Sequence, residues 1–162
     1  QPSPSEWDAL RSHATGVIEL TGRLDAAEVA TRELARGYVP SLSLLLGPLG
    51  AAKLVVLAGG RERLARMPSG SLQVLGASGA MAAHRRGAPP PKHSPVLFSL
   101  PQISKSPRWV RGKIARFIAG KCSIAVRADH FAGEPWDEEQ IAEINRKVDA
   151  IKARFPKPPK RG

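Results

Sequence analysis

The sequence predicts an all-α fold, in which a long N-terminal helix is followed by a compact helical domain, and three stretches carry this prediction. The central stretch, 106–127, has apolar residues at helical spacing on one side and basic residues on the other. The first stretch, 5–36, is rich in Ala, Glu and Arg, and the last, 137–155, repeats apolar residues every three or four positions. Helical patterns therefore dominate the chain.

The central stretch is expected to start its helix at Ser106, whose hydroxyl can cap the first turn, with Pro107 in the first helical position. At about 100° per residue, its apolar residues share one arc and four basic residues share another. The apolar arc holds Val110, Ile114, Phe117, Ile118, Cys122 and Ala125, and the basic arc holds Arg108, Lys113, Arg116 and Arg127. Arg111 and Lys121 project into the apolar half. The charged group of each must therefore reach solvent past the apolar residues, find a partner within the protein, or lie where this face of the helix is not covered by other elements.

The first stretch is expected to form one helix, with Ser5 as the candidate cap. Its seam has three-four spacing and comprises Trp7, Leu10, Ala14, Val17, Thr21, Leu24, Glu28 and Thr31. A helix of about 31 residues would be a rod of roughly 45 Å, longer than a compact domain of this size needs. Two interpretations stay open: half of a coiled-coil hairpin whose other half is absent, and an amphipathic helix lying on the core.

The remaining segments predict short elements. They are two buried helices within 39–60, a short helix at 61–67 stopped by Pro68, a strand fragment or helical turn at 71–75, an exposed loop at 76–95, and an amphipathic helix at 137–155. The tail that follows is basic and proline-rich, so we expect it to be extended.

Positive charge is concentrated in the middle of the chain. The formal net charge is +11, and no acidic residue lies between Glu62 and Asp129, a segment that holds twelve basic ones. A field of one sign attracts polyanions, and nucleic acid is the first candidate. A solvated basic surface without a specific partner is the alternative. A membrane surface fits less well, because the apolar face of the central helix is predicted to be core and only 5% of residues are aromatic.

The sequence offers no catalytic or metal-binding constellation, so we expect neither an enzyme nor a cofactor. His13, His84, His93 and His130 show no ligand spacing, and the single cysteine, Cys122, cannot build a structural zinc site. The motif GPLGAAK lacks the spacing of a phosphate-binding loop, and AGGRERLAR lacks the third glycine of a dinucleotide fingerprint. A lone cysteine in an apolar helix face is more often a small inert hydrophobe than a nucleophile.

A series of motifs resembles the Nop domain. SPRWVRGKIAR at Ser106 to Arg116, followed by GKCSIAVRADHFAG, looks like the signature helix of that domain. Upstream, VPSLSLLLGPLGAAKLVVLAGG, RLARMPSGSLQVLGA and PPKH follow in the same order as in the family, and PKPPKR resembles its end. The resemblance covers about residues 38–160. The Nop domain occurs in the scaffold proteins of C/D-box ribonucleoproteins and in a related spliceosomal precursor-processing factor.

The resemblance implies an all-α domain that recognises kink-turn RNA together with a small kink-turn-binding protein. The matching RNA contacts are Arg66 and Ser69 near the Met67-Pro68 turn, His93, and Arg116 and Arg127 on the central helix; Arg108, Arg111 and Lys113 of that helix complete the predicted RNA-binding set. The predicted partner-contact loop is Gly76, Ala77, Ser78 and Gly79, where archaeal members usually read Gly-Ala-Glu-Lys.

These observations predict a non-enzymatic RNA-binding scaffold, archaeal in type and located in the cytoplasm, or in the nucleus and nucleolus of a eukaryote. Guided 2′-O-methylation would be carried out by a separate methyltransferase, fibrillarin, whose docking region precedes the coiled coil in full-length members and is not in this sequence. The expected division is 1–37 as a coiled-coil remnant, 38–157 as the Nop domain and 158–162 as a basic tail. The alternative is a protein-interaction module, with pairing of a second copy through the first helix and an incidental basic surface.

Overall fold

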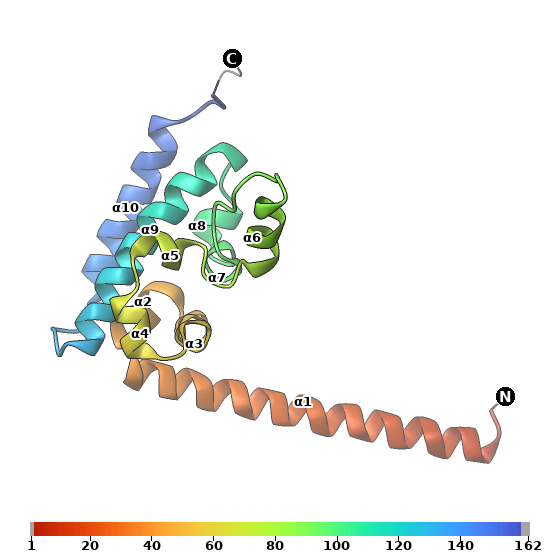
Figure 1. The fold of residues 1–162 in the computed structure, drawn as a ribbon. Coiled ribbons are helices and arrows are strands. Elements are labelled where there is room, and N and C mark those ends of the chain that lie inside the picture. The colour runs from red at the N-terminus through yellow and green to blue at the C-terminus, as the bar shows by residue number, and fades with distance from the viewer. Residues whose placement is uncertain (1, 160–162) are drawn as a thin grey trace.

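The computed structural model describes residues 2–159, and every regular element in that range is an α-helix. The helices are α1 Pro4–Tyr38, α2 Pro40–Leu46, α3 Pro48–Ala58, α4 Arg61–Arg66, α5 Ser69–Gln73, α6 Ser78–Arg85, α7 Pro95–Phe98, α8 Pro101–Ser104, α9 Arg108–His130 and α10 Glu138–Arg154. A long first helix followed by a helical body is confirmed (Figure 1). Residues 160–162 of the predicted tail lie outside the described residues.

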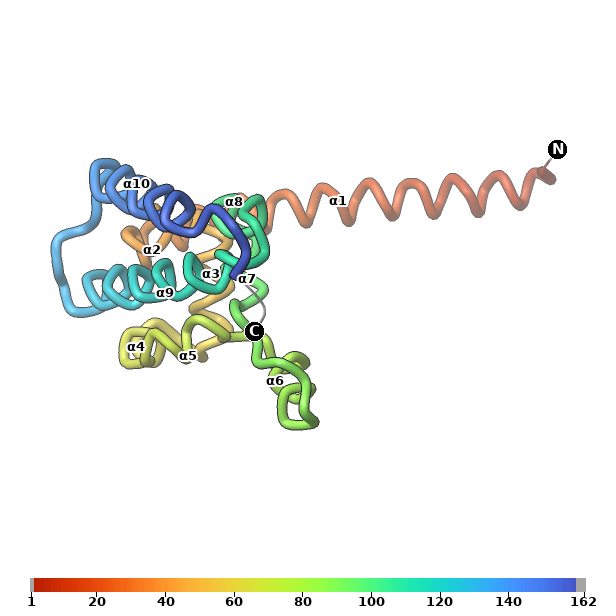
Figure 2. Tube along the Cα trace, turned by 90° about the horizontal axis from the view of Figure 1, so that it is seen from above, coloured from red at the N-terminus to blue at the C-terminus, as the bar shows by residue number. Residues whose placement is uncertain are grey.

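α9 is the centre of the body. Its buried side, which includes Ile114, Ile118 and Cys122, packs against helices from both halves of the chain, chiefly α2, α4, α5, α8 and α10. Figure 2 shows α9 between α10 on one side and α4 and α5 on the other. The facing helices contribute the fully buried side chains Leu42, Leu64, Leu72 and Val148. The apolar arc predicted for this helix is the face that makes the core.

Proline marks where several helices begin. Pro40, Pro48, Pro95 and Pro101 occupy the first turn of α2, α3, α7 and α8. The fixed φ of proline suits this position, and the N–H that it lacks has no helical partner there. Short helices therefore follow one another with sharp changes of direction, which wraps the chain around α9.

The predicted pair of buried helices is confirmed in α2 and α3. Leu42, Leu46, Ala51 and Leu54 are buried, and α3 ends at Gly59, which has the left-handed φ of +81°. In the described part of the chain, no single helix is long and apolar enough to cross a membrane; α2 and α3, bent by 116° to each other, reach that length and composition only as a pair.

The end of α9 is tied to the start of α2. The Asp129 carboxylate accepts hydrogen bonds from the backbone N–H groups of Ser41 and Leu42, at 2.9 and 3.0 Å. The first N–H groups of a helix have no partner within it. The hydroxyl of Ser41 in turn accepts a 3.0 Å bond from the backbone N–H of Trp136, so this contact also fixes the link to α10.

α1 extends away from the body (Figures 1 and 2). Its one buried residue is Ala35, and its packing partners are α2 and α3. Trp7, Val17, Leu24 and Leu34 on the rod are all more than half exposed. The interpretation of this helix as lying on the core is therefore wrong, and the coiled-coil hairpin stays a prediction.

Two predicted helix caps are corrected. Ser3, not Ser5, caps α1: its hydroxyl accepts the backbone N–H of Glu6, whose carboxylate accepts the N–H of Ser3. The hydroxyl of Ser106 does not cap α9, because it donates a 2.6 Å bond to the carbonyl of Gln102. Ser106 is instead buried in the turn between α8 and α9.

The segment 71–95 is more helical than expected. Residues 71–73 close α5, so the helical turn is the correct alternative and the strand fragment is not. Within 76–95, predicted as a loop, residues 78–85 form α6, because the run SGAMAAHR has good helix formers once the glycine is passed. α6 stands away from the rest of the body (Figure 2).

Candidate nucleic-acid interface

α9 presents its cations because its opposite side is fixed in the core. With Ile114 and Ile118 fully buried, Arg116 and Arg127 are exposed. These two arginines are eleven residues apart, which on an α-helix brings them within about 20° of the same direction. Arg108 and Lys113 flank Arg116 by about 80° and about 60° on either side. The predicted positive side of the helix is therefore open to solvent.

The turn between α4 and α5 adjoins this side of α9. Leu64 and Ala65 of α4 are buried, and the guanidinium of Arg127 donates a 3.0 Å hydrogen bond from Nε to the Ala65 carbonyl. Arg66 and Ser69, on either side of the Met67-Pro68 turn, are exposed. Arg66, Ser69 and Arg127 are thus brought together from two helices. Arg66 pairs with Glu62 at 3.1 Å, and both side chains are two-thirds exposed.

His93 lies in a cationic cleft of about 380 Å³ near the start of α9. The cleft is lined by Pro90, Lys92, His93, Phe98, Arg108 and Arg111. The imidazole of His93 stacks on the Phe98 ring, with centroids 4.7 Å apart and planes 15° apart. The segment is fixed in place by Gln73, which donates a 2.7 Å bond from Nε2 to the Lys92 carbonyl. Gly112 of α9 lies against the segment, since a Cβ added there would come within van der Waals contact, 3.4 Å, of that of Lys92.

Arg111 is held by backbone carbonyls at the edge of this cleft. Its Nε donates to the Ser106 carbonyl at 2.8 Å and its Nη2 donates to the Ser104 carbonyl at 3.0 Å. Of the three alternatives predicted for a cation in the apolar half of the helix, Arg111 therefore follows the second, because it has hydrogen-bond partners within the protein. Its guanidinium closes the turn between α8 and α9 and lies 5.4 Å from the centre of the Phe98 ring.

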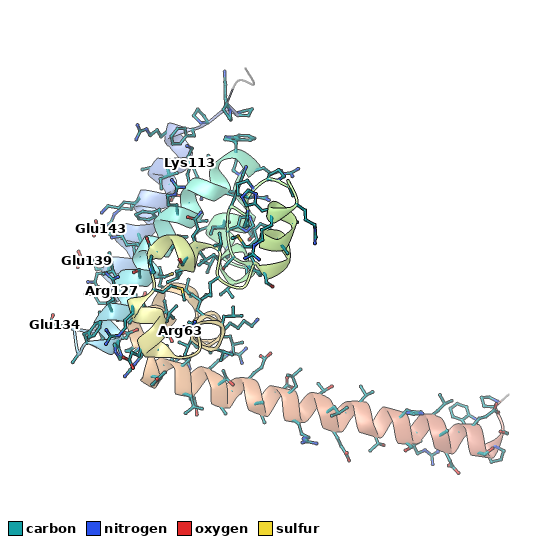
Figure 3. The ribbon with its side chains drawn as sticks, in the orientation of Figure 1. Arg63, Lys113, Arg127, Glu134, Glu139 and Glu143 are labelled. Atoms are coloured by element: carbon teal, nitrogen blue, oxygen red, sulfur yellow. The ribbon has the colours of Figure 1, made fainter. Side chains whose placement is uncertain are left out.

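Lys113 is directed toward α10. Its ammonium lies 4.3 Å from the centre of the Phe155 ring, which follows that helix. Figure 3 shows Lys113 beside the C-terminal end of α10 and Arg127 near the other end of α9. Lys113 is thus separated from the group formed by Arg66, Ser69 and Arg127.

The predicted partner-contact loop is the entry to α6. Gly76 has a φ of +81°, and a Cβ there would lie only 2.9 Å from Cδ1 of Leu57, so the position requires glycine. Ala77 is buried, whereas Ser78 and Gly79 are exposed in the first turn of α6. The two positions that differ from the usual family residues are therefore accessible.

The cleft adds Lys92 and Phe98 to the site residues that the sequence predicts. Lys92 had a usable signal, because it directly precedes His93 in the charged segment. Phe98 had none, since its place beside His93 depends on the turn that Ser94 caps at the start of α7. Both now belong with the cleft.

Cys122 has no reactive environment. It is fully buried in α9, and burial raises the pKa of its thiol well above the ordinary value. Within residues 2–159, His, Cys, Asp and Glu side chains form no group of three or more that could hold a metal ion.

Comparison with known proteins gives a consistent result. A family model, Nop, described as "snoRNA binding domain, fibrillarin", matches residues 1–150. A NOP5 family protein of Methanocaldococcus jannaschii is 46% identical over 127 residues, which covers 78% of this chain and 30% of that protein. Nucleolar protein 56 of Homo sapiens is 33% identical over 128 residues, covering 78% of this chain and 21% of that protein.

A solved structure extends the match to the fold. A chain in the crystal structure of a fibrillarin/Nop5p complex aligns with a TM-score of 0.74 and 30% identity, over 93% of this chain and 56% of that one. This chain thus spans less than two thirds of each of these relatives. Since the family model matches nearly the whole chain and the resemblance seen in the motifs is confirmed, this protein belongs to the Nop family, whose domain binds snoRNA.

Proposed function

We propose that this chain is a non-enzymatic RNA-binding scaffold of a C/D-box-type ribonucleoprotein. It recognises kink-turn RNA jointly with a small kink-turn-binding protein and supports guided 2′-O-methylation by a separate methyltransferase. The observation that carries the proposal is the meeting of the Met67-Pro68 turn with the positive side of α9, where Arg127 is bonded to the Ala65 carbonyl. Membership of a family described as snoRNA-binding supports the same conclusion.

The chemistry of this surface suits an RNA backbone better than a specific base sequence. Arginine has a planar fork that can bridge two phosphate oxygens, and no carboxylate interrupts the chain from Arg63 to Ala128. The major groove of A-form RNA is too deep and narrow for side chains, which leaves shape and backbone as the readable features. We therefore expect low sequence specificity from this chain alone, and joint recognition with the partner protein.

The site residues have different roles in this proposal. Arg66, Ser69, Arg116 and Arg127 contact phosphates along one side of α9, and His93, Arg108 and Lys92 contact the RNA at the cleft. Arg111 supports that cleft through its bonds to Ser104 and Ser106, and Lys113 supplies positive charge on the flank. Gly76 to Gly79 form the contact with the partner or guide RNA.

The remaining assignments concern the whole particle. We propose that residues 1–37 belong to a coiled coil and that 38–157 form the RNA-binding unit. By analogy with nucleolar protein 56, a eukaryotic chain would function in the nucleolus and an archaeal one in the cytoplasm.

An electrophoretic shift with a kink-turn RNA, measured with and without the kink-turn-binding protein, tests the proposal. We expect weak binding by the chain alone and a stable ternary complex with both partners. A kink-turn RNA whose kink is replaced by regular duplex is the matched control, and it should give no ternary complex. Failure of this chain to shift the RNA–partner complex would refute the proposal.

A second candidate function is helix pairing through α1, which the exposed apolar residues of the rod favour. Val17, Ile18, Leu20 and Leu24 are all at least 60% exposed. Such residues in a long helix are typical of a coiled-coil strand, and a second copy of this chain is one partner for it. Sedimentation equilibrium tests this pairing: a concentration-dependent dimer that Leu24→Glu abolishes would support it, and a monomer at all concentrations would refute self-pairing.

A further inference from the structure

A second hollow, lined by three arginines, lies along α4. It has a volume of about 450 Å³ and is formed where α1 joins the body. Its walls are Tyr38 at the end of α1, the Gly59-Gly60 turn, and Arg61, Glu62, Arg63 and Arg66 of α4. None of these except Arg66 belongs to the RNA-binding set predicted from the sequence.

The arginines of the hollow are positioned by contacts with its walls. Arg61 donates a 2.7 Å bond from Nη1 to the Tyr38 carbonyl, and its guanidinium carbon lies 4.3 Å from the centre of the Tyr38 ring. The Nε of Arg61 is buried and, among residues 2–159, has no hydrogen-bond partner. Arg61 is therefore oriented by the protein while one of its donors remains unused.

The glycine turn allows the second arginine to lie across the backbone. Gly59 and Gly60 have φ values of +81° and +128°, which other residues adopt only under strain. A Cβ built on Gly59 would lie 3.6 Å from Nη1 of Arg63, so this guanidinium rests over the turn. Arg63 is exposed, which leaves it free to meet a ligand.

The charge of the hollow, and its continuity with the proposed RNA surface, indicate that its ligand is an anion. Glu62 is the one acidic residue of α4, and it already pairs with Arg66, so Arg61 and Arg63 contribute uncompensated positive charge. Arg66 lines the hollow and also belongs to the proposed RNA surface, and Arg127 is bonded to Ala65 of the same helix. Figure 3 labels Arg63 on α4 and Arg127 on α9, two helices that pack against each other. The positive surface therefore continues around α4 to the base of the rod.

We propose that this hollow binds backbone phosphates of an RNA stem that flanks the kink, with Arg63 as the main contact and Arg61 as its oriented support. This inference rests on the proposed function, because it extends the same RNA path past Arg66. Guanidinium groups beside exposed backbone suit phosphate oxygens, which accept several hydrogen bonds at once. An acidic protein segment could use the same donors, but the continuity with Arg66 and Arg127 favours RNA.

The test uses the full chain, the kink-turn-binding protein and three RNAs: one with two long stems, and two in which one stem or the other is cut to a minimum. Dissociation constants and their salt dependence are measured for Arg63→Ala, for Arg116→Ala and for Arg23→Ala, an exposed arginine on the rod that serves as the matched control. Arg63→Lys, which keeps the charge, tests for partial rescue. Thermal unfolding checks that each variant is folded.

We expect Arg63→Ala to weaken binding of the long RNA several-fold and to lower its salt slope by about one ion. The loss should disappear when one particular stem is shortened, whereas Arg116→Ala should weaken binding of all three RNAs. If Arg63→Ala behaves like Arg23→Ala while Arg116→Ala weakens binding, this inference is wrong and the proposed function stands. An equal loss on all three RNAs would also contradict it. So would a variant that keeps its RNA binding but loses binding to polyglutamate, a probe that stands for the acidic protein segment and is measured in parallel. No binding of any RNA by the wild type would refute both.

Discussion

The two long helices of this protein differ in what surrounds them. α9 buries nine residues in the body and exposes cations, whereas α1 buries only Ala35 and exposes apolar side chains along most of its length. α9 holds six basic residues and one acidic residue, while α1 holds four basic and six acidic ones. The comparison teaches that one helix organises the core and presents a positively charged side to solvent, whereas the other leaves its apolar side chains without cover from the body.

The largest effect that would separate the two helices comes from matched isoleucines. Ile118 on α9 is 1% exposed, and Ile18 on α1 is 71% exposed. Ile118→Ala should lower the free energy of unfolding by about 2–5 kcal/mol, because it leaves a cavity in the core. Ile18→Ala should change it by less than about 0.5 kcal/mol. Urea denaturation measures both, and similar losses for the two variants would contradict the contrast.

The tie between α9 and α2 gives the next largest effect. Asp129→Ala removes the acceptor of two backbone N–H groups and should cost about 1–3 kcal/mol of stability. Asp149→Ala, which removes an exposed carboxylate paired with Lys152, is the control and should have little effect. Thermal unfolding compares them, and a melting temperature of Asp129→Ala equal to that of the wild type would show that the tie is dispensable.

A smaller effect is expected on RNA affinity when the carboxylate beside Arg66 is removed. Glu62 places a carboxylate beside Arg66, so Glu62→Gln should free this arginine and remove repulsion of RNA phosphates. We expect RNA affinity to rise by at most about fivefold, the upper limit that corresponds to an exposed ion pair. Glu28→Gln, which removes the same kind of pair with Arg32 on the rod, should leave affinity unchanged. Weaker RNA binding by Glu62→Gln would count against a role for Arg66.

The smallest expected effect concerns the buried thiol of α9. Because burial raises the pKa of Cys122, the folded protein should not react with iodoacetamide even at a pH where free thiols ionise, near 8.5. The neutral thiol is the form that the fold favours, so its contribution to stability is present below that pH and is lost as the pH rises. Labelling followed by mass spectrometry measures the reaction, and rapid modification of the native protein would show that this face of α9 is open.

The sequence predicted the long helices better than their caps and the short helices between them. Periodicity located α9 and α10 within a few residues and assigned Ile114 and Ile118 to the core, because burial of one face imposes that spacing. It misplaced the cap at Ser106, because the Gln102 carbonyl that accepts this hydroxyl is supplied by α8. The sequence also failed to predict α6, because the glycines and prolines on either side of its eight residues indicated a loop.

The candidate site was predictable in part for the same reason. The shared direction of Arg116 and Arg127 follows from helix geometry, and the family motifs singled out Arg66, Ser69 and His93. The orientation of Lys113 toward Phe155 and the stacking of His93 on Phe98 depend on contacts between distant segments. A helical projection cannot predict such contacts, because it gives the direction of a side chain but not which residues of other segments lie in that direction.

The most direct test of the account is the salt dependence of RNA binding by two double variants. One is Arg116→Ala with Arg127→Ala on α9, and the other is Arg11→Ala with Arg23→Ala on α1, so each removes two exposed arginines. The affinity of each variant for the complex of kink-turn RNA with the kink-turn-binding protein is measured over a range of salt concentrations. We predict that the α9 variant loses about two ions of salt slope and that the α1 variant keeps the wild-type slope. Equal slopes for the two variants would contradict the assignment of RNA binding to α9.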